Sequence, residues 1–265
     1  MKILIPTAKE LNKKAIPHKK ISLSDKSTEI VSEIAKLSVE DLAKAYKIKD
    51  EKAVEEFSRW EKINNKTAKS FEALELFNGL MYRNIDRASF DETDKKYIKE
   101  NVFITTSLYG VIGAYDLIQE HRLDFLQNIK ISSQSLKNFW REDYDKSIKG
   151  EELVVSLLSS EFEEVFSKEQ RDGFIRLSFM EEKEGVLKVH STISKKARGK
   201  FLTELVKNKV SSVDEMKQIK FDGFEYNEEN SDEKTLAFIA KDKKIGKVKY
   251  KRKIIKRTDE DEIRN

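Results

Sequence analysis

The basic run at residues 195–200 is the part of the sequence best suited to hold an anion. It opens a predicted helix, because it follows Ser194, a good N-cap residue, and precedes an apolar helical pattern from Phe201. Cations in the first turns of a helix oppose its macrodipole by a few tenths to about 1 kcal/mol each. A bound anion would relieve this conflict, and a solvated run paired with nearby carboxylates is the alternative. The candidate residues are Lys195, Lys196, Arg198 and Lys200.

A second group of lysines surrounds a predicted turn at 48–50, between two short helices within residues 37–60. Helix-hairpin-helix modules present such a turn to a DNA backbone without reading bases. This turn lacks the glycines that let a phosphate approach the main chain closely, so an ordinary helical hairpin fits as well. The candidate phosphate contacts are Lys44, Lys47, Lys49 and Lys52.

A third region combines glycines with polar residues after a predicted strand. Gly110 and Gly113 indicate a tight turn, but their spacing matches neither a phosphate loop nor a dinucleotide-binding fingerprint. Downstream, Asp116, Arg122 and Asp124 form either a polar cluster at a site or a structural ion-pair network. The candidate cleft-lining residues are Tyr109, Gly110 and Asp116, and Arg122 and Lys9 are further candidate anion contacts.

The composition argues against several classes of chemistry. The chain has no cysteine, which excludes thiolate nucleophiles, disulfides and cysteine-ligated metal sites. Its three histidines, His18, His121 and His190, are widely separated and none has ligand spacing. No nucleophile-elbow pattern surrounds a serine. We therefore expect no cofactor, no stably bound metal and no catalytic residue that the sequence alone identifies.

The positive charge is concentrated near the C-terminus. Residues 241–257 contain ten Lys or Arg against one Asp, whereas residues 1–240 carry a net charge of −2 within a total of +4. Polyanion binding by residues 1–240 must therefore come from a local patch. The N-terminus lacks a signal-peptide pattern and no apolar stretch is long enough to span a membrane, so we expect a cytoplasmic protein without membrane contact.

Hydrophobic periodicity predicts a mixed α+β architecture. Short apolar runs indicate buried strands, alternation indicates a β-hairpin, and a period near 3.6 indicates helices. Strands are predicted at 3–5, 102–104 and 154–158, a hairpin within 172–194, and helices at 30–37, 42–46, 54–60, 67–78 and 201–209. We expect one domain over residues 1–240 and a basic, then acidic, tail over 241–265.

Seven segments form an ordered set that is similar to a known family. They are Ile3-Leu4-Ile5 with Ala8-Lys9, Phe77-x-Gly79-x-x-Tyr82, Leu108-Tyr109-Gly110-Val111 with Asp116-Leu117 and Arg122-Leu123, Phe139-Trp140, Ser159-Ser160-Glu161, Lys195 to Gly199, and Phe221 with Gly223-Phe224. Together they resemble the YaaA peroxide-stress family over about residues 1–240. The sequence departs from the family at Ala114 and Glu120, where proline is usual, and at Ser156 and Ser160, which replace Asn and Asp.

This resemblance implies a cytoplasmic protein of hydrogen peroxide resistance, linked with iron limitation and DNA repair. It also implies a curved mixed β-sheet packed with helices, the "cantaloupe" fold, with a positively charged cleft and a helix-hairpin-helix element. We therefore expect a non-enzymatic DNA-binding protein that contacts the phosphates of double-stranded DNA or repair intermediates without base specificity. The alternative is an enzyme that binds a small phosphorylated or carboxylated substrate in the same basic cleft.

Overall fold

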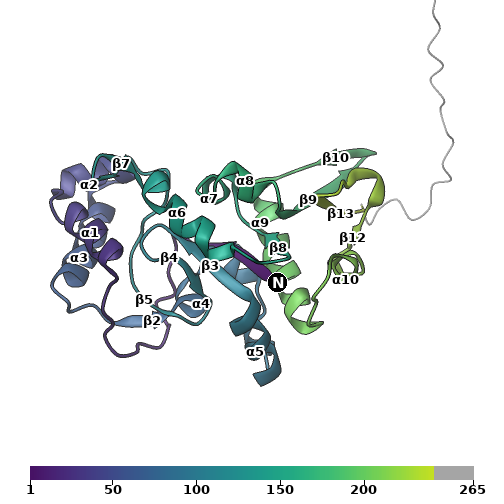
Figure 1. The fold of residues 1–265 in the computed structure, drawn as a ribbon, viewed down its shortest axis with the longest axis horizontal. Coiled ribbons are helices and arrows are strands. Elements are labelled where there is room, and N and C mark those ends of the chain that lie inside the picture. Colours follow the sequence, from purple (N-terminus) through teal and green to yellow (C-terminus); the bar gives the residue numbers. More distant parts are fainter. Residues whose placement is uncertain (242–265) are drawn as a thin grey trace, which may run out of the picture.

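A nine-stranded mixed sheet forms the centre of the computed structural model, which describes residues 1–241 (Figure 1). Its strand order is β11-β12-β13-β9-β8-β1-β3-β4, and β10 pairs with the C-terminal end of β9, off this path. The five central strands are parallel, namely β13 (Thr235–Ala240), β9 (Ile175–Lys183), β8 (Val154–Ser156), β1 (Lys2–Pro6) and β3 (Val102–Thr106). The antiparallel strands are β4 (Gly110–Gly113), β10 (Val186–Lys188), β11 (Lys220–Phe221) and β12 (Phe224–Tyr226). The predicted mixed sheet packed with helices is confirmed.

Helices cover both faces of this sheet (Figure 1). The α-helices are α1 (Asp25–Ile34), α2 (Val39–Tyr46), α3 (Asp50–Asn64), α4 (Ala73–Leu76), α5 (Glu92–Asn101), α6 (Leu136–Ile148), α7 (Ser160–Glu163), α8 (Lys168–Arg171), α9 (Ser191–Lys207) and α10 (Val213–Lys217). Three 3-10 helices, η1 (Tyr82–Asn84), η2 (Arg87–Ser89) and η3 (Glu228–Asn230), lie in loops. Two small two-stranded sheets pair β2 (Ser70–Glu72) with β5 (Leu117–Gln119) and β6 (Lys130–Ile131) with β7 (Gln134–Ser135).

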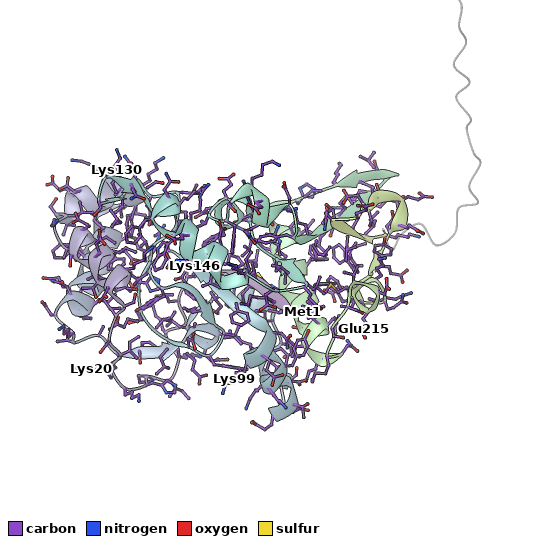
Figure 2. The ribbon with its side chains drawn as sticks, viewed as in Figure 1. Met1, Lys20, Lys99, Lys130, Lys146 and Glu215 are labelled. Atoms are coloured by element: carbon purple, nitrogen blue, oxygen red, sulfur yellow. The ribbon has the colours of Figure 1, made fainter. Side chains whose placement is uncertain are left out.

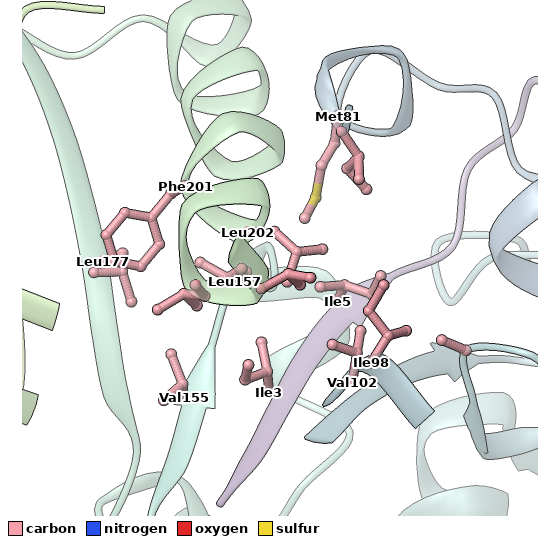
Figure 3. Packing of buried hydrophobic residues seen from close by; sticks show 14 of the residues in the cluster. Ile3, Ile5, Met81, Ile98, Val102, Val155, Leu157, Leu177, Phe201 and Leu202 are labelled. Carbon is pink, nitrogen blue, oxygen red and sulfur yellow. The ribbon is translucent and has the colours of Figure 1, made fainter. Parts of the chain in front are cut away.

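Strand β1 separates two hydrophobic cores. Because side chains alternate along a strand, Ile3 and Ile5 face one core while Leu4 faces the other, and all three are fully buried. In the first core, Leu202 of α9 lies near Ile5, and Phe201 of α9 lies beside Leu177 of β9 (Figure 3). The second core contains α1, α3 and α6. This burial on both faces explains why an uninterrupted apolar run forms the central strand.

Three sequence predictions need correction. The segment 67–78 is not one helix, because residues 70–72 pair with β5 and only Ala73–Leu76 is helical. The hairpin predicted within 172–194 forms, but its second strand ends at Lys188. Helix α9 begins at Ser191 with His190 as N-cap, so Ser194 is not the cap and the basic run occupies the second and third turns.

The shift of the helix start changes the electrostatics of the basic run. The macrodipole acts mainly within the first turn, and Lys195 and the cations after it lie beyond that turn. Repulsion by the helix N-terminus therefore contributes less than the sequence predicts. Any anion site at this run depends on the side chains and on the elements around them.

Candidate functional site

A pocket of about 420 Å³ lies at the carboxyl ends of β1 and β8. Its walls come from residues 6–10 after β1, residues 159–162 after β8, the turn at 79–83, and the start of α9. Among the parallel strands, β3 follows β1 in the chain and lies on one side of β1. The later strands β8 and β9 are added on the other side of β1. This reversal of strand order is the place where open parallel sheets bind ligands. The fold therefore puts the pocket at the expected position for a site.

The basic run of α9 is divided between two faces of the helix. Lys195 and Arg198, one turn apart, line the pocket together with Thr192. Lys200 instead forms an ion pair with Asp222. Lys196 is exposed and does not line the pocket. The four cations thus do not act as one cluster, and only two of them can reach a ligand in the pocket.

Two glycines allow the walls of the pocket to approach each other closely. A Cβ atom on Gly199 would lie 2.2 Å from the Met81 carbonyl oxygen, and one on Gly79 would lie 2.7 Å from the Cβ atom of Ala8. The Tyr82 hydroxyl donates a hydrogen bond of 2.8 Å to the Pro6 carbonyl. The turn that contains η1 is therefore held between the end of β1 and helix α9, which fixes the geometry of the pocket.

The segment after β8 contributes a half-buried carboxyl group to the pocket lining. The Glu161 Oε1 atom accepts a hydrogen bond of 3.0 Å from the Phe125 backbone N–H. Burial, and then the nearby Asp124 carboxylate, raise the pKa of Glu161. Lys9 Nζ lies 2.9 Å from Asp124 Oδ2, and Asp124 is itself buried. Lys9 is thus a pocket residue whose charge is largely matched by Asp124.

The candidates Tyr109, Gly110 and Asp116 lie away from this pocket, in and after the turn between β3 and β4. The Tyr109 hydroxyl donates to Gln119 Oε1 at 3.1 Å, and Asp116 accepts a 2.8 Å hydrogen bond from the Gly113 N–H. A Cβ on Gly110 would lie 2.9 Å from the Trp140 ring, and its φ is +76°. These contacts show that Tyr109, Gly110 and Asp116 serve the local structure of this turn.

The candidate Arg122 is also outside the pocket lining. Its charge acts on Tyr46 and Glu56 of the α2–α3 hairpin, whereas Asp124 pairs with Lys9 at the pocket. Among the described residues, Asp116, Arg122 and Asp124 therefore form neither a common polar cluster nor an ion-pair network with one another.

The lysines at 44–52 surround the turn between α2 and α3, at the left end of the molecule in Figure 1, whereas α9 lies nearer its middle. Lys47 adopts a left-handed backbone conformation that ends α2. Lys44 and Lys47 border a groove of about 640 Å³ that Lys130 also lines. Lys130 lies at the same edge of the molecule as α2 (Figure 2). Lys52 lies 3.5 Å from Glu55, and Lys49 is the N-cap residue of α3.

Sequence reasoning missed Glu161, Thr192 and Arg83 as pocket residues. Glu161 follows the end of a predicted strand, which is the one local signal that could have selected it. The pairing of β1 with β8 joins segments about 150 residues apart, and no local pattern indicates it. The predicted tail at 241–265 lies outside the described residues except for Lys241.

Residues 1–241 contain neither a group of side chains suited to a metal ion nor a helix suited to crossing a membrane. In that range no three His, Asp or Glu side chains come together in a way that could hold a metal ion. Likewise, none of the helices there combines the length and the apolar composition that crossing a membrane requires.

Comparison with known proteins identifies the family. Residues 1–230 match the family described as peroxide stress protein YaaA. A UPF0246 protein of Streptococcus gordonii is 49% identical over 241 residues, which are 91% of this chain and 99% of the relative. A UPF0246 protein of Streptococcus thermophilus is 49% identical over 92% of this chain and 100% of its own length. One from Streptococcus pneumoniae is 46% identical over 90% and 99%. The chain therefore belongs to the peroxide stress protein YaaA family.

Proposed function

We propose that this protein acts in the cytoplasm in defence against peroxide and binds DNA through the phosphate backbone, without reading base sequence. The observation that carries the proposal is that two adjacent lysines on α9 are exposed and have no carboxylate partner among residues 1–241. Lys195 and Lys196 are both exposed, and among residues 1–241 neither has a carboxylate within 4.0 Å. Other lysines of α9 are paired, Lys200 with Asp222 and Lys207 with Asp94. Unpaired exposed cations are the groups that phosphates recruit.

The lysines of the α2–α3 hairpin support a second contact with the DNA backbone. Lys44, Lys47 and Lys49 have no carboxylate within 4.0 Å among the described residues, whereas Lys52 is close to Glu55. The two lysine groups lie at separate parts of the molecule in Figure 1. A DNA duplex that contacts both would therefore have to extend across the body of the protein. Loss of each group should weaken binding independently.

Replacing Lys195 and Lys196 by alanine should weaken duplex binding and lower its dependence on salt. Each phosphate contact contributes about 0.9 to the slope of log affinity against log salt, so the slope should fall by about 2. Fluorescence anisotropy with a labelled duplex at several salt concentrations measures both quantities. The Lys44→Ala/Lys47→Ala variant should behave similarly.

A lysine pair on α5 provides the matched control. Lys95 Nζ lies 2.7 Å from Glu92 and Lys96 Nζ lies 3.9 Å from Glu100, so both already have carboxylate partners. The Lys95→Ala/Lys96→Ala variant removes the same net charge and should keep the wild-type salt slope. Equal losses of DNA affinity and of salt slope in this variant and in Lys195→Ala/Lys196→Ala would show only a net-charge effect. That result would contradict the proposal.

A further inference from the structure

Arg198 has an incompletely neutralised charge at the wall of the pocket. Its Nε atom is buried and has no hydrogen-bond partner among the described residues. Burial lowers the pKa of its guanidinium group. The carboxylate that acts on it, Glu163, is already engaged, since Arg176 Nε donates to Glu163 at 2.9 Å and Ser156 donates to it as well. The protein itself therefore leaves Arg198 without a dedicated counterion.

An anion in the pocket would complete this arrangement. A desolvated cation is costly unless it is paired and hydrogen-bonded. The planar guanidinium group suits the oxygens of a phosphate or carboxylate, and Lys195 adds a second positive charge on the same wall. Thr192, in the first turn of α9, lines the same space. The α9 wall is thus built to attract an oxyanion.

Glu161, which lines the pocket from the segment after β8, adds selectivity. The groups that act on it are the Phe125 N–H, the carboxylate of Asp124, and the ammonium groups of Lys9 and Lys137. Burial and Asp124 together outweigh these cations, so the pKa of Glu161 is raised. In its protonated form the carboxyl group donates a hydrogen bond to an anion, whereas its ionised form repels one. The pocket therefore presents cations from α9 and a protonatable acid from the segment after β8.

We propose that this pocket binds the phosphate of a phosphomonoester, with Arg198 and Lys195 against the phosphate oxygens and the protonated form of Glu161 as a hydrogen-bond donor to it. The volume of about 420 Å³ falls within the range of small-molecule sites and cannot admit a DNA duplex. The phosphate belongs either to a free small molecule or to the 5′ end of a DNA strand. This site shares Lys195 with the proposed contact to internal phosphates, whereas Arg198 and Glu161 belong to the pocket alone.

Calorimetric titration of the full chain with three probes tests this site. The probes are inorganic phosphate, a 5′-phosphorylated thymidine dinucleotide and the same dinucleotide without that phosphate. We expect the first two to bind and the third not to bind. Tighter binding of the phosphorylated dinucleotide than of phosphate identifies a strand end as the source, and equal binding identifies a small phosphate compound. Failure of both phosphorylated probes to bind overturns the proposal.

The Arg198→Gln variant should bind phosphate at least about tenfold more weakly, as expected for loss of a charge-assisted hydrogen bond. Arg171 is the matched control, because it is also half-buried with an unpartnered Nε but lies on α8, outside the pocket lining. Arg171→Gln should bind as the wild type does. The Arg198→Lys variant keeps the charge and should be weakened less, which gives a result even if Arg198→Gln folds poorly. Unchanged affinity in both Arg198 variants overturns the proposal.

Two further measurements separate this site from the proposed DNA contact and from a purely structural role. Closed circular DNA has no strand ends, so Arg198→Gln should bind it as tightly as the wild type even where phosphate binding is lost. Sulfate keeps its charge while Glu161 titrates, so its affinity should fall as pH rises in the wild type. The Glu161→Gln variant should not show this fall. The same pH dependence in that variant overturns the assigned role of Glu161.

Discussion

Replacing Gly199 by alanine should destabilise the protein by about 3 kcal/mol, the upper range for an overpacked contact. Helix propensity alone predicts the opposite sign, because alanine in a helix interior is favoured over glycine by about 1 kcal/mol. The new Cβ would lie 2.2 Å from the Met81 carbonyl oxygen and 3.0 Å from Asn84. Backbone atoms cannot yield as a flexible side chain does, so α9 must move away from η1. Urea-induced unfolding measures the change.

Gly173 provides the control for this substitution. A Cβ there would approach only the Gln170 carbonyl oxygen, at 3.4 Å, which is close to an ordinary contact. Gly173→Ala should therefore change the unfolding free energy by less than about 1 kcal/mol. A Gly199→Ala variant as stable as the wild type would contradict the close packing of α9 on the 79–84 turn. The pocket wall formed by that turn would then also need revision.

Stability should fall by roughly 3 kcal/mol on acidification because His121 is buried without charge. Its ring is 2% exposed, Nδ1 donates to the Gln119 carbonyl at 2.7 Å, and burial lowers its pKa from 6.5 to about 4. The unfolded chain binds a proton near pH 6.5, whereas the folded chain does so only near pH 4. This contribution is therefore fully present above pH 6.5 and is lost as pH falls through the folded-state value.

Comparison of two histidine variants isolates this effect from the titration of carboxylates. His121→Gln removes the buried titrating group, so the loss of unfolding free energy between neutral and acidic pH should shrink by roughly 3 kcal/mol. His18 is exposed, and His18→Gln should keep the wild-type pH dependence. Identical pH profiles for all three proteins would show that His121 titrates normally.

Local sequence patterns predicted the elements whose burial is uniform along their length. Ile3 to Ile5 is buried on both faces, so a plain apolar run was enough to identify β1. The segment 67–78 was assigned wrongly because Ser70–Glu72 becomes a strand through its partner Leu117–Gln119, a contact distant in sequence. The start of α9 was placed four residues late because His190 caps the helix without a side-chain hydrogen bond.

The site was harder to predict than the elements. The basic run contained Lys195 and Arg198, which do line the pocket, but helical geometry directs Lys200 toward Asp222 instead. Residue type alone does not separate these orientations. Glu161 became a pocket residue through the parallel pairing of β8 with β1. Sequence analysis could therefore identify candidate charges but not which of them meet.

The position of β1 has a consequence for how the chain folds. Strand β1 is translated before both of its partner strands, and it pairs Leu4 with Phe103 on one side and with Ser156 on the other. Neither partner exists until much of the chain has been translated, and contacts so distant in sequence slow folding. The apolar strand β1 must therefore avoid aggregation until β3 and β8 have been translated. Because α9 comes later still, the pocket can close only after most of the nascent chain has been synthesised.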